Sequence, residues 1–173
     1  MANRKTPIVI LGIDPGLANT GFGVIKKQGS ALTMIDYGCI KTQAKTPDQD
    51  RLLIINQSLN RLIKTYQPDI VAVEKLFFAK NAKTAMAVGQ ARGVIVLAAG
   101  KNRLKVAEFT PLQVKMALTN YGQASKNQVQ QMVKIILALK TAPTSDDAAD
   151  ALATAICCAH TLKPVATPGN DAD

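Results

Sequence analysis

The sequence predicts an α/β fold in which helices cover both faces of a mixed five-stranded sheet. Three strand-like segments with short turns open the chain, and two later short apolar segments each follow a helical stretch. We therefore expect three antiparallel strands and then two parallel ones. A length of 173 residues and a hydrophobic content of 47% suit one domain with a sizeable core. We place this domain at residues 1–163 and expect a disordered tail over residues 164–173.

The first three predicted strands lie near the start of the chain. Residues 7–13 form a continuous apolar run, as expected of a buried strand. Strands over 20–27 and 31–42 follow, with Gly29 and Ser30 as the turn between them. We expect these segments to form an antiparallel meander.

Helices and strands alternate in the middle of the chain. Apolar residues at helical spacing predict an amphipathic helix over 48–66, which Pro68 ends. Residues 69–74 are short and continuously apolar, which is typical of a parallel strand covered on both faces. A helix over 80–99 and a strand over 104–109 complete the sheet.

The last third of the chain is predicted to be helical. Thr110 is a natural N-cap for a helix that runs to about Leu118, and Ser125 caps a second helix. A third helix begins after Pro143 and runs to about Leu162. This helix is apolar apart from a group of acids at its start.

The helix over 80–99 has a flat stripe of small residues. Ala85, Gly89 and Gly93 recur at intervals of four residues. Glycine inside a helix costs ~1 kcal/mol relative to alanine, so the stripe indicates a close backbone approach. The approach is either a tight contact within the monomer or a dimer seam, and the sequence does not decide between them.

The positive charge of the chain is concentrated in one region. The formal net charge is +9, and residues 75–140 contain eleven Lys or Arg residues but one acid, Glu108. Surfaces normally mix charges of both signs. One-signed charge of this size favours a phosphate backbone as the partner.

Membrane and disulfide classes do not fit the sequence. No stretch approaches the ~20 apolar residues of a membrane span. The three cysteines, Cys39, Cys157 and Cys158, form neither a disulfide framework nor a C-x-x-C metal motif. Cys157 and Cys158 fall in the apolar last helix, where we expect them to serve as small hydrophobic residues. A reducing cytoplasm is the expected location.

Four carboxylates stand at positions where apolar segments would normally exclude them. Asp14 and Glu74 end two predicted strands, and Asp147 and Asp150 share one face at the start of the last helix. Moving a carboxylate out of water costs several kcal/mol unless a counter-charge is present. The pattern predicts a shared site for Mg²⁺, with Mn²⁺ as a substitute. Two such ions ~4 Å apart would clamp the attacking water and the leaving oxygen of a phosphodiester.

Local explanations remain open for some of these acids. Asp146 or Asp147 could satisfy the helix N-terminus and its dipole. Asp14 could form a turn before Pro15. Glu74 has no comparable local explanation.

Three segments together resemble one known family. GIDPGLANTGFGVI (12–25), VAVEKLFFAKNAKTAMAVGQARGVI (71–95) and SDDAADALATAI (145–156) are similar to motifs of the RuvC family of Holliday junction resolvases. The resemblance runs in order from about residue 8 to 162. It implies a fold of the ribonuclease H and retroviral integrase type. It also implies a crossover junction endodeoxyribonuclease that acts in DNA recombination and repair.

The resemblance assigns roles to individual residues. It implies metal ligands at Asp14, Glu74, Asp147 and Asp150, and the spacing D-A-A-D-A-L selects Asp147 over Asp146 for the third ligand.

Lysines and an aromatic residue follow from the same resemblance. Lys115 looks like the family lysine near the scissile phosphate, and Lys126 resembles a second lysine of the catalytic site. Phe77 matches an aromatic that stacks on an unpaired junction base, although the neighbouring Phe78 leaves that choice open. The residues that we expect to contact DNA are Phe77, Lys80, Lys83, Arg92, Lys115 and Lys126.

The family also implies partners. Its members act as homodimers in which each subunit nicks one of two equivalent strands of a four-way junction, which leaves ligatable ends. They prefer a short sequence at the cut, and they work with the RuvA and RuvB branch-migration proteins.

Three alternatives remain at this stage. The segment DPGLANTGFGV (14–24) resembles the first phosphate loop of the actin, sugar-kinase and heat-shock ATPase superfamily. Those phosphotransferases need two such domains, which 173 residues cannot supply. A DNA-binding module without catalysis would explain the lysines but not four carboxylates that repel DNA. A related nuclease that cuts RNA in a hybrid shares the same chemistry.

Overall fold

The structure is a computed structural model that describes residues 6–75 and 82–162. For residues 82–84 it describes the backbone but not the side chains. Its elements follow the predicted order, and most ends differ from the prediction by one or two residues. They are β1 (Ile8–Asp14), β2 (Asn19–Gln28), β3 (Ala31–Lys41), α1 (Asp48–Tyr66), β4 (Ile70–Glu74), α2 (Ala82–Lys101), β5 (Lys105–Phe109), α3 (Pro111–Thr119), α4 (Lys126–Ile136) and α5 (Asp146–Thr161).

The five strands form one mixed sheet in the order β3-β2-β1-β4-β5. β1, β2 and β3 pair antiparallel, and β4 and β5 extend the sheet parallel to β1. The sheet confirms the predicted arrangement of three antiparallel strands and two parallel ones. It also brings the ends of β1 and β4 to the same edge, because parallel strands end on one side of a sheet.

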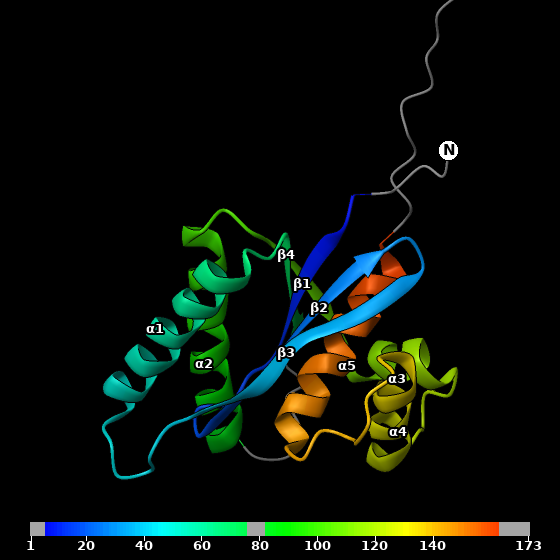
Figure 1. Cartoon of the computed structure of the whole chain (residues 1–173). Helices are drawn as coiled ribbons and strands as arrows, with labels where there is room; N and C mark the ends of the chain where they lie inside the picture. Colours follow the sequence, from blue (N-terminus) through cyan, green and yellow to red (C-terminus); the bar gives the residue numbers. More distant parts are fainter. Residues whose placement is uncertain (1–5, 76–81, 163–173) are drawn as a thin grey trace, which may run out of the picture.

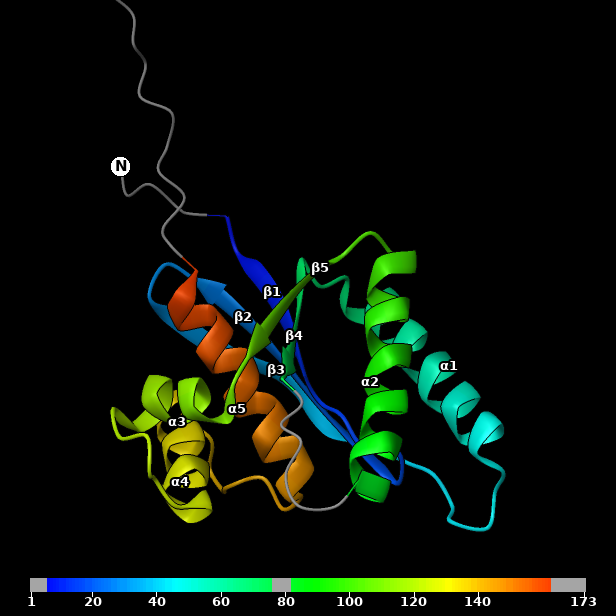
Figure 2. The same cartoon turned by 180° about the vertical axis from the view of Figure 1, so that it is seen from behind.

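Helices cover both faces of the sheet, as Figures 1 and 2 show. α1 and α2 pack on one face, around a core that includes Leu11 and Ile13. α3, α4 and α5 lie on the other face, around a core that includes Ile10 and Ala72. Since successive strand residues point to opposite faces, Asp14 and Glu74 lie on the same face as Ile10 and Ala72.

α5 lies across the strands at very short range. A Cβ atom on Gly12 of β1 would come within 2.1 Å of the Ala151 carbonyl oxygen. A Cβ on Gly21 of β2 would come within 2.0 Å of the Asp147 carbonyl oxygen. The two glycines therefore let the backbone of α5 rest on the sheet, and any larger residue would push the helix away.

The helices of the α5 face begin where the sequence predicts. Thr110 caps α3 and Ser125 caps α4, each in a reciprocal capping box with a glutamine three residues later. Ser145 caps α5, so that helix begins at Asp146, after Pro143 as predicted. Cys157 and Cys158 are buried in α5, as expected of small hydrophobic residues.

The stripe of small residues on α2 faces outward at Gly93. No atom of the described residues lies within 4 Å of the position that a Cβ on Gly93 would take. Met86 and Leu97 are exposed on the same helix, at 70% and 52%. The alternative of a tight contact inside the monomer therefore does not hold at Gly93. Nowhere in the described ranges is a helix both long and apolar enough to cross a membrane.

Candidate active site

Two carboxylates meet at the edge of the sheet where β1 and β4 end. Asp14 is the last residue of β1 and Glu74 the last of β4. Ile13 pairs with Val73 across these parallel strands, so the two acids follow one another at neighbouring positions. Both lie on the α5 face of the sheet. The sequence prediction that each of these acids ends a strand is confirmed.

The start of α5 brings two further carboxylates to the same edge. Gly21 pairs directly with Asp14, and the backbone of Asp147 rests on Gly21. Asp150 follows one helical turn later and lies on the same side as Asp147. The structure thus gathers all four acids that the sequence singled out, from two strand ends and one helix start.

Asp14 carries the largest electrostatic effect in this group. Burial, and after it repulsion by Asp150, Glu74 and Asp147, together raise its pKa from 3.8 to about 7. Lys126 opposes the shift and does not offset it. The nearby positive charge is therefore too small to balance an ionised Asp14 at neutral pH.

Glu74 and Asp150 respond to the same surroundings. Burial is the main cause that raises the pKa of each carboxyl, and Asp150 adds repulsion at Glu74. Lys115 and Lys126 act in the opposite direction on Glu74. These four residues line one cleft of about 210 Å³, in which α3 and α4 bring the lysines to face the carboxylates.

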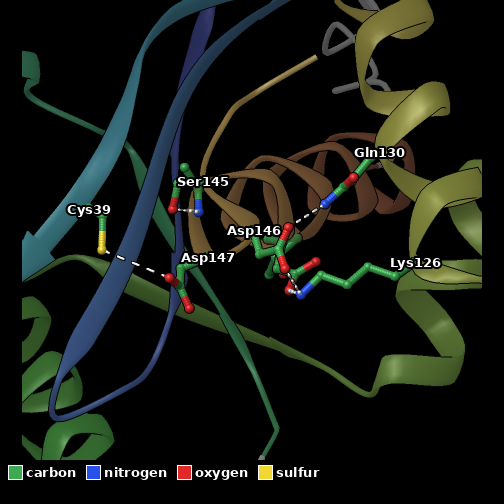
Figure 3. Close-up of polar contacts among 9 residues, drawn as sticks. Cys39, Lys126, Gln130, Ser145, Asp146 and Asp147 are labelled. Atoms are coloured by element: carbon green, nitrogen blue, oxygen red, sulfur yellow. Dashed lines mark hydrogen bonds and ion pairs between the residues drawn. The ribbon is translucent and has the colours of Figure 1, made fainter.

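Lys126 forms ion pairs with two carboxylates at the cleft. Its Nζ lies 3.1 Å from Asp150 Oδ2 and 3.2 Å from Asp146 Oδ2. The other oxygen of Asp146 accepts a hydrogen bond of 2.8 Å from Gln130 Nε2. Figure 3 shows Lys126 and Gln130 reaching from α4 to Asp146 at the start of α5. α4 and α5 are thus joined by a polar contact beside the carboxylates.

Asp147 points away from this contact and toward β3. Cys39 Sγ lies 4.0 Å from Asp147 Oδ2, and Figure 3 shows the two side chains facing each other. Burial, followed by the charge of Asp147, raises the pKa of the Cys39 thiol, so the thiol stays protonated beside the site. The sequence analysis did not place Cys39 here, because no local pattern relates a strand residue to a helix more than 100 positions later.

The donor set suits a hard divalent cation. All four acids offer oxygen ligands, which Mg²⁺ and Mn²⁺ prefer. The raised pKa of Asp14 shows that positive charge is needed at the same place. Across residues 6–75 and 82–162, no three Asp, Glu, His or Cys side chains yet surround a common point closely enough to bind an ion. The residues fit a divalent cation by charge and donor type, and ligation by several of them requires side-chain rotation.

The predicted DNA contacts have different outcomes. Lys115 and Lys126 line the cleft. Arg92 on α2 forms an ion pair with Glu108 of β5, with 27% of its side chain exposed, and its role in DNA binding stays a prediction. Phe77 and Lys80 lie outside the described residues, as do Phe78 and the side chain of Lys83.

Sequence comparison relates the chain to one family. A family model described as crossover junction endodeoxyribonuclease RuvC matches residues 10–158. The crossover junction endodeoxyribonuclease RuvC of Halothermothrix orenii is 57% identical over 150 residues, which are 87% of this chain and 91% of the relative. That of Heliobacterium modesticaldum is 55% identical over 155 residues, which are 90% of this chain and 96% of the relative.

Solved structures agree with the sequence comparison. RuvC of Thermus thermophilus in complex with its Holliday junction substrate is similar with a TM-score of 0.83 at 36% identity, over 87% of this chain and 92% of the other. The yeast mitochondrial Holliday junction resolvase Ydc2 shares the fold, with a TM-score of 0.61 at 14% identity, over 87% of this chain and 78% of the other. The predicted ribonuclease H-like fold class is confirmed.

Proposed function

The chain belongs to the RuvC family of crossover junction endodeoxyribonucleases, and we propose that it resolves four-way DNA junctions by metal-dependent hydrolysis of phosphodiesters. The products are paired, symmetric nicks with ends that can be ligated. Family membership sets aside the phosphotransferase alternative. It also makes four-way junction DNA the preferred substrate over an RNA–DNA hybrid.

One observation carries the proposed chemistry. The four carboxylates meet at one edge of the sheet, and burial together with their mutual repulsion raises the pKa of Asp14 to about 7. Such a group of acids is compatible with a polyanionic substrate only if cations lie between them. Asp14, Glu74, Asp147 and Asp150 would hold Mg²⁺ or Mn²⁺, with two ions in each site. The bound ions would activate water and neutralise charge on the phosphate.

The lysines of the cleft complete the site. Lys115 and Lys126 line the same cleft as Glu74 and Asp150. A positive charge fixed in this position stabilises the negative charge that develops on a phosphate under attack. We assign Lys115 and Lys126 to this role.

Further contacts would hold the junction. The basic excess of residues 75–140 supplies charge for the DNA backbone. Lys80, Lys83 and Arg92 belong to this region, and we assign them to DNA binding. Phe77 would stack on a base that has lost its pairing at the junction, since stacking on an aromatic contributes ~1–3 kcal/mol.

We also propose that the chain acts as a homodimer through α2. Met86 and Leu97 expose apolar side chains on this helix, and Gly93 leaves room for a close backbone approach. Two copies related by a two-fold axis would present two sites to the two equivalent strands of a junction. We further propose that the chain acts in the cytoplasm together with RuvA and RuvB. We also propose that residues 1–163 form a single domain.

The proposed chemistry is tested by separating cleavage from binding. Asp14→Asn and Glu74→Gln should each abolish cleavage of a four-way junction in Mg²⁺ while junction binding in Ca²⁺ or EDTA persists. Asp50→Asn is the matched control, because Asp50 is an exposed acid on α1, on the opposite face of the sheet from the carboxylates. It should retain cleavage. Loss of binding together with cleavage in Asp14→Asn and Glu74→Gln would show that these acids serve folding instead.

A further inference from the structure

Asp146 lies beside the carboxylates, and both of its oxygens contact residues of α4. It is the first residue of α5, and 65% of its side chain is exposed. Its Oδ1 accepts a hydrogen bond from Gln130 and its Oδ2 lies 3.2 Å from Lys126 Nζ. Figure 3 shows its side chain directed toward α4, whereas Asp147 is directed toward Cys39. Asp146 Oδ2 and Asp150 Oδ2 therefore contact the same ammonium group.

Lys126 contacts two carboxylates, of which Asp150 is a proposed metal ligand and Asp146 is not. Its Nζ is 3.1 Å from Asp150 Oδ2 and 3.2 Å from Asp146 Oδ2. A divalent cation that uses Asp150 as a ligand competes with the ammonium group for the same oxygen, and the two cations also repel each other. Asp146 then remains as the carboxylate that can keep Lys126 in place. Gln130 fixes the direction of Asp146 by holding its other oxygen.

We propose that Asp146 is a positioning residue, which retains Lys126 at the site when Asp150 turns to a metal ion. The inference deepens the proposed function and rests on it, since it requires a cation at Asp150. In the absence of metal, Lys126 neutralises Asp150. With a metal ion on Asp150, Lys126 would give up its contact with Asp150, keep its contact with Asp146 and stay available for the phosphate.

Two simpler roles for Asp146 must be distinguished from this one. An acid in the first turn stabilises a helix through the dipole, which affects folding alone. A negative charge near a cation site also favours any cation, whatever Lys126 does. Neither role depends on Lys126, so a double-mutant cycle between positions 126 and 146 separates them from the proposed role.

The test measures Mn²⁺ binding to the DNA-free full chain by isothermal titration calorimetry. Asp146→Asn should weaken binding by about 1.5- to 5-fold, the range that exposed ion pairs produce. Lys126→Met alone should tighten binding, because it removes the competing ammonium group. In the Lys126→Met background, Asp146→Asn should have no further effect. Asp50→Asn on α1, on the opposite face of the sheet, carries the same change of charge and should leave binding unchanged.

A second variant guards against a folding defect in Asp146→Asn. Gln130→Leu keeps the charge of Asp146 and removes only the hydrogen bond that directs it. It should weaken Mn²⁺ binding in the same direction by a smaller factor, and the effect should vanish with Lys126→Met. Circular dichroism confirms that each variant is folded before titration.

The outcomes separate the inference from the proposed function. Equal weakening by Asp146→Asn with and without Lys126 would overturn the inference and leave the metal site standing. Unchanged Mn²⁺ binding by Asp146→Asn would likewise overturn the inference and leave the metal site standing. Absence of Mn²⁺ binding by the unaltered protein, or binding that survives Glu74→Gln and Asp150→Asn together, would overturn the metal site and the inference with it.

Discussion

The backbone of Asp147 rests on Gly21. A Cβ atom on Gly21 would lie 2.0 Å from the Asp147 carbonyl oxygen and 2.3 Å from its carbonyl carbon. Gly21 is also the residue that pairs with Asp14 across β1 and β2. One glycine therefore sets the separation between a carboxylate at a strand end and a carboxylate at a helix start.

Gly21→Ala should impair activity more than it impairs folding. The methyl group meets backbone, which cannot rotate away, so the start of α5 has to move. We expect a loss of about 1–3 kcal/mol in the free energy of unfolding. We also expect about 100-fold slower junction cleavage, since a displacement near 1 Å is enough for such a loss. Chemical denaturation and single-turnover cleavage measure the two effects.

Gly100→Ala is the matched control for this prediction. Nothing among the described residues lies within 4 Å of a Cβ at Gly100, which is in α2 on the far side of the sheet. This variant should cleave at the normal rate and be as stable as the unaltered protein or slightly more stable. Normal cleavage by Gly21→Ala would contradict the role of Gly21 as the spacer between Asp14 and Asp147.

Asp14→Asn should stabilise the protein in EDTA. Asp14 has a pKa of about 7 in the fold against 3.8 as an ordinary carboxyl. The fold thus favours the protonated form, and the stability that this proton brings is lost as the pH rises from about 4 through 7. Asparagine does not ionise, so Asp14→Asn should be more stable at pH 8 by on the order of 2 kcal/mol. The difference should disappear near pH 4.

With a divalent metal present, the unaltered protein should become more stable than Asp14→Asn. Mg²⁺ supplies the missing charge to the unaltered protein and binds the folded state alone, so it raises the melting temperature. Asp14→Asn lacks a ligand and should gain much less. Thermal unfolding at pH 8, with and without Mg²⁺, measures both effects. An Asp14→Asn variant that is less stable than the unaltered protein in EDTA at pH 8 would mean that Asp14 is not repelled by its neighbours.

Lys126→Met should slow cleavage without loss of folding. The ammonium group of Lys126 is the charge nearest to Asp150 and lies in the cleft beside Glu74. Removal of one fixed charge that stabilises developing negative charge typically costs about 10²–10³-fold in rate. Lys134→Met on the same helix controls for the lost charge and should slow cleavage far less, because Lys134 is not among the residues that line the cleft. Equal rate losses in both variants would show that α4 contributes only general attraction for DNA.

Leu97→Glu should separate the proposed dimer into monomers. Leu97 is 52% exposed on α2, and a buried unpaired carboxylate at an interface is costly. Leu53→Glu is the matched control, because Leu53 is 54% exposed on α1. Sedimentation velocity should show a monomer for Leu97→Glu at micromolar concentration and a dimer for Leu53→Glu. A dimer in both cases would place the interface elsewhere.

Local patterns were sufficient to predict most of the fold and part of the site. Asp14 and Glu74 were predicted at strand ends because an apolar run precedes each of them. The caps Thr110 and Ser125 were predicted because each lies just before a periodic apolar stretch. Asp147 was distinguished from Asp146 only by resemblance to a family motif.

Long-range contacts explain what the sequence did not reveal. The contact of Lys126 with Asp146 and Asp150 depends on how α4 docks against α5, which no local spacing encodes. The position of Cys39 beside Asp147 has the same cause. The close approach at Gly21 had a visible signal, since glycines in β1 and β2 accompany an alanine-rich helix. Only the register of β1 and β2 shows that Gly21 lies between Asp14 and Asp147.

Cleavage of a labelled synthetic four-way junction in Mg²⁺ tests the central claim most directly. Linear duplex and RNA–DNA hybrid of the same sequences are the controls, and Glu74→Gln shows that the cutting depends on the carboxylates. We expect paired nicks at symmetric positions in the junction and none in either control. Cleavage of the hybrid with an intact junction, or junction binding without nicks across varied junction sequences, would contradict the account.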